Sequence, residues 1–579
     1  MKVLLIQPPI RDFYQTSVRT QPIGLAYVAA SLRTHGYEVE ILDCQTDQKR
    51  SVPIPPELSY LRDFYPFHDR SPFRLYVGFY HFGMGRDEIR QKIKDSKADV
   101  FGISSSFTSY HAEALDIARI IKEWDRTKTV VVGGSHVNCD PEGVLKSPDV
   151  DYVVLGEGEI RFPLLLERIK KNGAEKMEEI EGIGYRKGGE IRINPLQRFI
   201  EDLDRLPPPA RDLFAPDRYR MKKKRSTMLI TSRGCPHRCA YCSGHLVMGN
   251  HFRTRSPEAI VKEMKNCRER QGLQVFDIED DNFTYDQERA KRLLNLIIET
   301  FGEGTLDLSA MNGISFASLD GELLGLMKKA GFRTLNLSFV STDLFTRERM
   351  KRPMEMIEFD SILAEADQIG LNVIAYGILG MPGQTIDEMV ETLIYLMGRK
   401  VLIGPSIYYP TPGTPLFGWC KSEGFLPPHP SQLRSSALPI ETKEFCRLDL
   451  VTLFRLARVI NFIKGKMDTK ELGEGITWRD LCPIMKERAK ANENEKFRAE
   501  TAMKANSNTP CAMPHAPCDV TWRDLLLLFL EEKSFFSLRK APDRKRMVVR
   551  EMTSREVLDC FFEKGLDIPI LRSHFHRKP

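Results

Sequence analysis

The chain has 579 residues, of which 42% are hydrophobic and 28% charged, and its formal net charge is +6. Such a length predicts about three or four domains, and such an apolar fraction excludes a wholly disordered chain. The positive excess is too small to indicate a nucleic-acid scaffold or a basic membrane coat. The longest strongly apolar run, Leu525 to Leu530, falls far short of the ~20 residues of a membrane helix. Twelve cysteines without a signal peptide indicate reduced thiols in a cytoplasmic protein.

The first region, residues 1–195, alternates apolar strands such as Val3–Gln7 and Val100–Ser104 with helical patterns, apart from a long insertion or loop between Gln45 and Gly83. This alternation predicts a doubly wound, Rossmann-like parallel sheet, which binds ligands at the carboxyl ends of its strands. Small and polar residues follow those ends and allow a ligand to approach the backbone. They are Ser104, Ser105, Ser106, Gly133, Gly134, Ser135, His136, Gly156, Glu157 and Gly158.

A proline-rich linker, residues 196–225, precedes a second alternating series over residues 226–425. Six strand and helix repeats in that series predict a β/α barrel or part of one, and the pattern leaves open whether the barrel closes. Ser256 and Pro257 have the N-cap and first-turn chemistry of a helix start. Beyond residue 425 the strand signal ends, so we expect residues 426–579 to form a mostly helical C-terminal domain.

Three cysteines, Cys235, Cys239 and Cys242, share one short loop after the first strand of the second series. Thiolates are soft ligands that select zinc or iron–sulfur clusters. Structural zinc needs four ligands, and the fourth could come from His237 or from the distant Cys511 and Cys518. The latter pair, with the histidine between them, could also form an auxiliary metal site. An iron–sulfur cluster with three protein ligands instead leaves one iron open.

The CxxxCxxC spacing, with the aromatic Tyr241 before the third cysteine, resembles the signature of the radical S-adenosylmethionine superfamily. The resemblance implies that the three cysteines hold a 4Fe–4S cluster whose fourth iron binds S-adenosylmethionine. Reductive cleavage of that molecule then gives a 5′-deoxyadenosyl radical, which acts on an unactivated carbon of the substrate.

Further stretches of the barrel resemble the same superfamily. The acidic run from Asp277 to Phe283 resembles the end of its second strand, where a carboxylate faces the ammonium group of the cofactor. The segments 377–385 and 409–415 resemble its fifth and sixth strand ends. The chain departs from relatives after the fourth strand, where it lacks their common glutamate, and at Gln384. The residues implied to bind S-adenosylmethionine are Tyr241, Glu279, Asp280, Asp281, Ser338, Ser341 and Gly380.

The first region is similar to the cobalamin-binding domain that precedes many radical S-adenosylmethionine barrels. The stretches that carry this similarity are 5–9, 132–136 and 151–159. It implies that cobalamin is bound by Ser104, Ser105, Gly133, Gly134, Ser135, His136, Gly156 and Glu157. The DxHxxG loop that supplies a cobalt-ligating histidine in other cobalamin enzymes is absent from the sequence. His136 is a weaker candidate for that role than for a hydrogen bond to the backbone or to the corrin. The alternative is a degenerate domain that keeps the fold without the ligand.

Together the two resemblances imply a cobalamin-dependent radical enzyme that methylates carbon, with a low-potential donor of the flavodoxin or ferredoxin type and a small-molecule or peptide substrate. Ring contraction or another rearrangement, and oxidative cyclisation, use the same architecture. A tRNA methylthiotransferase would need more cysteines in the first domain, where only Cys44 and Cys139 occur. A non-catalytic sensor of cobalamin or redox state is the alternative outside enzymes.

Overall fold

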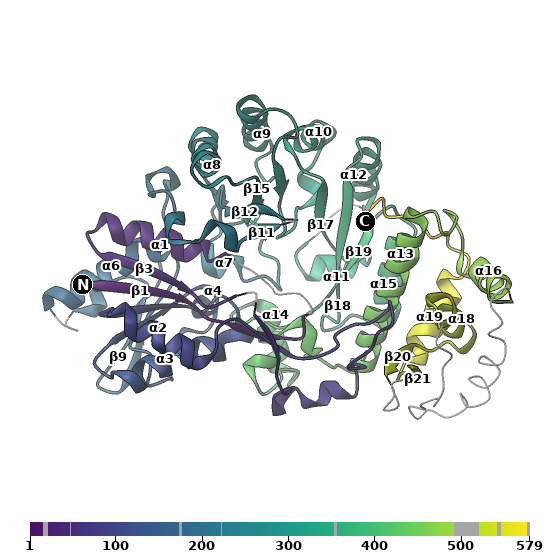
Figure 1. Cartoon of the computed structure of the whole chain (residues 1–579), viewed down its shortest axis with the longest axis horizontal. Coiled ribbons are helices and arrows are strands. Elements are labelled where there is room, and N and C mark those ends of the chain that lie inside the picture. Colours follow the sequence, from purple (N-terminus) through teal and green to yellow (C-terminus); the bar gives the residue numbers. More distant parts are fainter. Residues whose placement is uncertain are drawn as a thin grey trace.

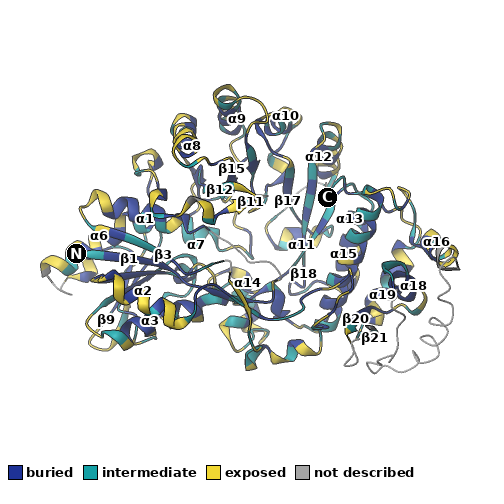
Figure 2. Ribbon diagram, in the orientation of Figure 1, coloured by how far each residue is buried: buried dark blue, intermediate teal, exposed yellow. Residues whose placement is uncertain are grey.

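The computed structural model describes residues 1–14, 21–46, 48–172, 176–221, 223–352, 356–490, 520–540 and 546–575 (Figure 1). An N-terminal sheet and a curled central sheet lie next to each other, and helices form the C-terminal end. Figure 2 shows buried strands between helices whose outer faces are exposed. Within the described residues, no helix is both long enough and apolar enough to span a membrane.

The N-terminal sheet has seven strands in the order β10-β9-β8-β7-β6-β1-β3. Its strands are β1 (Lys2–Gln7), β3 (Glu38–Asp43), β6 (Val100–Ser104), β7 (Thr129–Gly133), β8 (Tyr152–Val154), β9 (Ile183–Lys187) and β10 (Glu190–Ile193). The first five are parallel, whereas β9 and β10 are added antiparallel at one edge. This arrangement confirms the predicted Rossmann-like sheet, with an antiparallel extension that the sequence pattern did not indicate.

Helices cover both faces of this sheet because its strands are apolar on both sides. One face packs against α1 (Ile23–Thr34) and α6 (Gly158–Asn172). The other packs against α2 (Arg86–Ser96), α3 (His111–Trp124) and α5 (Pro141–Leu145). The chain passes from β1 to β3 on one side and later to β6 on the other, so the direction of strand order reverses beside β1. Such a switch point opens a crevice at the carboxyl ends of the strands.

The central region is an open barrel. Its strands are β12 (Lys224–Leu229), β15 (Val275–Ile278), β16 (Asp307–Ser309), β17 (Thr334–Val340), β18 (Asn372–Leu379) and β19 (Leu402–Ile407). They form two parallel sheets, joined by bridges from Leu308 to Phe332 and from Ile314 to Leu337. In the part of the chain that the structure describes, β12 and β19 do not pair with each other, so the barrel does not close. The short strand β11 (Arg220–Met221) instead extends the β12 edge.

Helices cover the outside of the curled sheet (Figure 1). They are α8 (Pro257–Gln271), α9 (Gln287–Phe301), α10 (Gly321–Ala330), α12 (Met356–Gln368) and α13 (Ile386–Met397). The predicted start of α8 is confirmed, since the Ser256 hydroxyl accepts a hydrogen bond from the backbone N–H of Ala259 at 3.3 Å. The cysteine loop follows β12 and the two-residue strand β13 (Ser232–Arg233), which pairs with β14 (Arg253–Thr254).

Residues 48–82 form a strap rather than a free loop. It contains β4 (Lys49–Ser51), the short helix η1 (Pro56–Arg62) and β5 (Tyr80–Phe82), and β4 and β5 make a small sheet with β2 (Ile10–Asp12). The hydroxyls of Tyr60 and Tyr65 donate hydrogen bonds to the carbonyls of Ala437 and Ser436, at 2.6 and 2.7 Å. Figure 1 shows the strap running from the N-terminal sheet towards α15.

The C-terminal region is mainly helical, as predicted. Its helices are α15 (Arg447–Asp468), α16 (Trp478–Lys490), α18 (Trp522–Glu532) and α19 (Arg555–Gly565). The sequence reading missed one hairpin, β20 (Phe536–Lys540) with β21 (Arg546–Arg550). Each strand has few apolar residues among basic ones, so the strand signal is weak. The strap reaches this hairpin too, because the backbone N–H of Arg70 donates to the carbonyl of Leu538 at 2.8 Å.

Candidate active site

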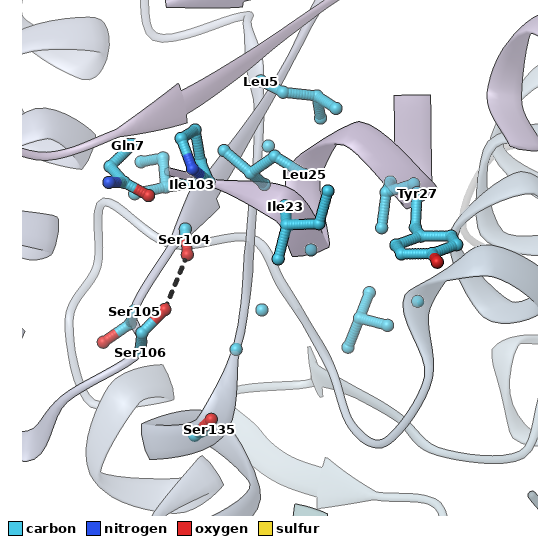
Figure 3. Close-up of a pocket in the computed structure, with 18 of the residues that line it drawn as sticks. Leu5, Gln7, Ile23, Leu25, Tyr27, Ile103, Ser104, Ser105, Ser106 and Ser135 are labelled. Atoms are coloured by element: carbon cyan, nitrogen blue, oxygen red, sulfur yellow. Dashed lines mark hydrogen bonds between the residues drawn. The ribbon is translucent and has the colours of Figure 1, made fainter. Parts of the chain in front are cut away.

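A cavity of about 400 Å³ lies at the switch point of the N-terminal sheet (Figure 3). Its walls come from both domains. The N-terminal domain contributes the ends of β1, β6, β7 and β8 and the start of α1, and the barrel contributes Met228, Ile230, Arg233, Met248 and Glu279. A mostly apolar cavity with a few polar groups at such a crevice is a typical cofactor site.

Most of the residues predicted to bind cobalamin line this cavity. Those that do so are Ser104, Ser105, Gly133, Gly134, Ser135, Gly156 and Glu157. Ser104 and Ser106 are joined by a hydrogen bond of 3.0 Å, and Figure 3 shows them opposite Ile23 and Leu25. Gly134 has a φ of +110°, and a Cβ there would lie 2.7 Å from the carbonyl oxygen of Ser105. The backbone can therefore make this tight turn beside the cavity only with glycine.

Other lining residues were not among the predicted ones. Gln7 ends β1, Pro8 and Pro9 follow it, and Ile23 and Gly24 begin α1. In a sheet of this kind, the residues at the end of the strand where the strand order reverses are expected to line the ligand site. Locating that point required the sheet order, which the sequence pattern alone did not supply.

His136 does not line the cavity. It lies on the short helix α4 (Ser135–Cys139), its ring centroid 4.4 Å from that of His111, and its Nδ1 is 3.0 Å from the Thr108 hydroxyl. Its Nε2 is buried without a hydrogen-bond partner. Burial lowers the pKa of His136 to about 3 and that of His111 to about 4, so both rings are neutral at pH 7. A role for His136 towards cobalamin stays a prediction.

The cysteine loop lies at the carboxyl end of β12. Cys239 is buried, Cys235 is half-buried and Cys242 is exposed. Desolvation of its thiol, followed by the negative charges of Cys239, Asp281 and Cys235, raises the pKa of Cys242 to about 11. In the part of the chain that the structure describes, no three acidic, cysteine or histidine side chains are close enough to hold a single metal ion.

Hydrogen-bond donors surround the three sulfur atoms. The backbone N–H of Gly244 lies 3.4 Å from Cys242 Sγ, and Nδ2 of Asn282 lies 4.0 Å from Cys235 Sγ. The Arg352 guanidinium lies 3.7 Å from Cys239 Sγ. Donors and a cation beside thiolates stabilise the negative charge that such a centre carries. The loop therefore fits a 4Fe–4S cluster. Cys511 and Cys518, proposed as alternative ligands, lie outside the described residues.

The three acidic residues that follow β15 have different surroundings. Glu279 lines the cavity, where burial and the neighbouring charge of Asp277 raise its pKa to about 8. Asp280 is buried and accepts hydrogen bonds from the backbone N–H of Thr231 at 2.7 Å and the Ser232 hydroxyl at 2.7 Å. Asp281 accepts from the backbone N–H of Gly234 at 3.0 Å and so holds the start of the cysteine loop.

The remaining predicted residues are partly engaged within the protein. The Ser338 hydroxyl accepts a hydrogen bond from Arg352 at 3.0 Å, close to Cys239. Ser341 is fully buried and accepts from the backbone N–H of Asp343 at 3.1 Å. A Cβ at Gly380 would lie 2.8 Å from the Leu450 side chain, so that glycine permits close packing of α15. Tyr241 is half-buried against the core, and burial raises its pKa.

The backbone is strained where the chain departs from its relatives. Val340 has a φ of +73°, and the pairing register between β17 and β18 shifts between Ser338 and Val340. A β-branched residue in the left-handed region costs about 1–3 kcal/mol, and such strain concentrates at functional sites. The bulge turns Ser338 towards the cysteine loop and Ser341 into the core.

Two family models match the chain. The radical SAM superfamily model matches residues 229–396, and the B12-binding domain model matches residues 75–166. The chain therefore carries a radical SAM superfamily domain, with a B12-binding domain ahead of it. It is therefore a cobalamin-dependent radical SAM enzyme, and the cofactors of this class are a 4Fe–4S cluster, S-adenosylmethionine and cobalamin.

Proteins similar to this chain include named methyltransferases. Cytidylyl-2-hydroxyethylphosphonate methyltransferase of Streptomyces wedmorensis is 28% identical over 475 residues, which are 75% of this chain and 84% of that protein. An uncharacterized methyltransferase of Pyrococcus horikoshii is 26% identical, over 82% of this chain and 95% of that protein. The radical S-adenosylmethionine methyltransferase TsrM from Kitasatospora setae has the same fold, with a TM-score of 0.55 and 17% identity, over 73% of this chain and 75% of that one.

Proposed function

We propose that this enzyme transfers a methyl group from S-adenosylmethionine, by way of cobalamin, to an unactivated carbon of its substrate. Residues 1–195 hold cobalamin, and residues 226–425 hold the cluster and S-adenosylmethionine. One observation carries the proposal. A single cavity is lined by the strand ends of the B12-binding domain and by Glu279 at the mouth of the barrel, so both cofactors can act in one space.

The chain's own residues supply binding and orientation. Cys235, Cys239 and Cys242 hold the cluster, Asp281 fixes the loop that carries them, and the glycine-lined strand ends provide a surface for the flat corrin ring. When bound, the cluster supplies the electron that cleaves S-adenosylmethionine, and cobalamin carries the methyl group. Glu279, near the second strand end, is placed to receive the ammonium group of S-adenosylmethionine, and the apolar cavity walls limit water at the reacting carbon.

The experiment is anaerobic reconstitution with iron, sulfide and hydroxocobalamin, followed by mass spectrometry of the products of S-adenosylmethionine carrying a deuterated methyl group. Methyl transfer predicts equal amounts of deoxyadenosine and S-adenosylhomocysteine per labelled product. Cytidylyl-2-hydroxyethylphosphonate serves as the first candidate substrate because a relative's name includes it. The matched control is a C235A/C239A/C242A variant, which should give neither nucleoside.

The alternatives predict other outcomes. Deoxyadenosine without S-adenosylhomocysteine would contradict methyl transfer and favour rearrangement or oxidative cyclisation. Loss of both nucleosides in the reconstituted wild type would favour a sensor. Methylthiolation of tRNA is less well supported, because the first domain has only Cys44 and Cys139 and Cys44 is buried.

The enzyme needs a reductant, and we propose a low-potential protein of the flavodoxin or ferredoxin type as the donor. Cys242 is the most exposed of the three cysteines, so a donor would approach a cluster held there from the side of Cys242. Reduced flavodoxin and reduced ferredoxin, each compared with dithionite in the deoxyadenosine assay, test this choice.

A further inference from the structure

Two buried carboxylates of the B12-binding domain meet two buried guanidinium groups of the barrel. Glu157 lies in the turn between β8 and α6, Glu159 lies in the first turn of α6, and both line the cavity. Arg233 and Arg253 lie directly opposite each other in the β13–β14 pair. The four side chains are between 0 and 6% exposed. We call this group the interdomain clamp.

Glu157 is the centre of the clamp. Its Oε1 accepts from Arg233 at 2.8 Å and from Arg253 at 2.9 Å, and its Oε2 accepts from the backbone N–H of Ile200 at 2.6 Å. The second guanidinium nitrogen of Arg233 donates to Glu159 at 2.6 Å. Both carboxylate oxygens of Glu157 are therefore used within the protein, and the cobalamin contact that the sequence resemblance implied stays a prediction.

The clamp joins the two cofactor-binding loops through short, stiff connections. On one side, Glu157 lies between Gly156, whose φ is +63°, and Gly158 in the turn that borders the cavity. On the other side, only Gly234 separates Arg233 from Cys235. Gly234 has a φ of +81°, and a Cβ there would lie 2.3 Å from the carbonyl oxygen of His251. Because each connection is so short, a displacement of the charged groups would shift the adjoining loop.

Aromatic rings and backbone carbonyls hold the two arginines in place. The Arg233 guanidinium lies 5.1 Å from the ring of Tyr27 on α1, and that of Arg253 lies 5.2 Å from the ring of Phe199. Arg253 also donates to the carbonyls of Ile200 at 2.6 Å and Met248 at 2.7 Å. Buried ion pairs contribute little to stability compared with apolar replacements, but separating the partners leaves an uncompensated buried charge, which is costly. The clamp is suited to setting geometry.

We propose that the clamp fixes the position of the cluster loop relative to the cobalamin surface, with Glu157 and Arg233 as positioning residues. The inference rests on the proposed function, since it concerns the distance over which the two cofactors cooperate. It goes beyond that function because it names the residues that set the distance. Weakening the clamp should leave both cofactors bound while their separation becomes variable.

The test is pulsed electron paramagnetic resonance on the reconstituted protein, with cobalamin as cob(II)alamin and the cluster reduced by dithionite. The coupling between the two electron spins reports their separation without turnover. We expect one narrow distribution in the wild type, a broader one in E157Q and R233K, and an intermediate one in E159Q, which removes only the outer pair. D212N is the matched control, because it breaks the exposed Arg33–Asp212 pair of 2.7 Å and should match the wild type.

If the distributions of the spin-to-spin distance in E157Q and E159Q are as narrow as the distribution in D212N, the proposal is overturned. If E157Q does not fold or load cofactors, E159Q against D212N decides alone. A second readout is the ratio of deoxyadenosine to methylated product, which should rise at least twofold in E159Q. If the wild type forms deoxyadenosine without S-adenosylhomocysteine, the proposed function fails while the spin measurement still judges the clamp.

Discussion

Arg352 should raise the reduction potential of the cluster. Its guanidinium lies 3.7 Å from Cys239 Sγ and donates at 3.0 Å to the Ser338 hydroxyl. Unit charges at that separation interact by about 4–5 kcal/mol at an effective dielectric constant of ~20. The electron added on reduction is shared over the cluster, so a mean separation of about 7 Å and an interaction of about 2 kcal/mol are more appropriate.

Replacing Arg352 with glutamine removes this attraction. At 59 mV per tenfold change of a one-electron equilibrium, we expect R352Q to lower the potential by about 50–100 mV. R352K keeps the charge and should lie nearer to the wild type. The assay is a redox titration of the reconstituted cluster followed by electron paramagnetic resonance, with iron content measured to confirm loading. A fully loaded R352Q cluster that shifts by less than about 20 mV would refute the reasoning.

Three further predictions concern cobalamin binding and stability. The G134A substitution places a Cβ 2.7 Å from the carbonyl oxygen of Ser105. We therefore expect the affinity for hydroxocobalamin, measured by equilibrium dialysis, to fall at least tenfold. An unchanged affinity would exclude this turn from the cobalamin site. Arg211 is buried and pairs with Glu263 at 2.7 Å, so the E263A substitution leaves a buried guanidinium without that carboxylate. We expect the free energy of unfolding, measured by urea titration, to fall by about 3–5 kcal/mol. A loss below about 1 kcal/mol would contradict this reasoning. Burial lowers the pKa of Lys464 from 10.5 to about 7, so the unfolded chain binds more protons above pH 7 and stability rises with pH there. The stability of wild type relative to K464M should therefore increase by about 2 kcal/mol from pH 7 to pH 9, and a difference independent of pH would refute the shift.

Local patterns sufficed for much of the fold. Strands such as β6 and β18 are short apolar runs bounded by turn residues, and the helix start at Ser256 follows cap chemistry, so both could be predicted from neighbouring residues. The cysteine loop could be predicted in the same way, because its three cysteines are close together in the sequence. The sheet order was not, because it depends on pairing between residues far apart, and with it the contribution of Gln7 and Ile23 to the cavity was missed.

The tasks of individual charged residues were the hardest to predict. Asp280 and Glu157 stand in motifs that resemble cofactor-binding segments, yet Asp280 holds the β12–β13 connection and Glu157 holds two arginines. Arg233 lies 76 positions after Glu157 along the chain. A sequence pattern shows that a charge is available at a strand end, but only the packed structure shows which opposite charge neutralises it.

The strap affects how cobalamin could enter the cavity of the folded protein. Residues 48–82 tether the N-terminal lobe to the far end of the molecule, through Tyr60, Tyr65 and Arg70. These hydrogen bonds oppose an outward rotation of the N-terminal lobe that would open the cavity for cobalamin. Uptake of hydroxocobalamin by the folded protein should therefore be slow, so binding should be measured only after prolonged incubation.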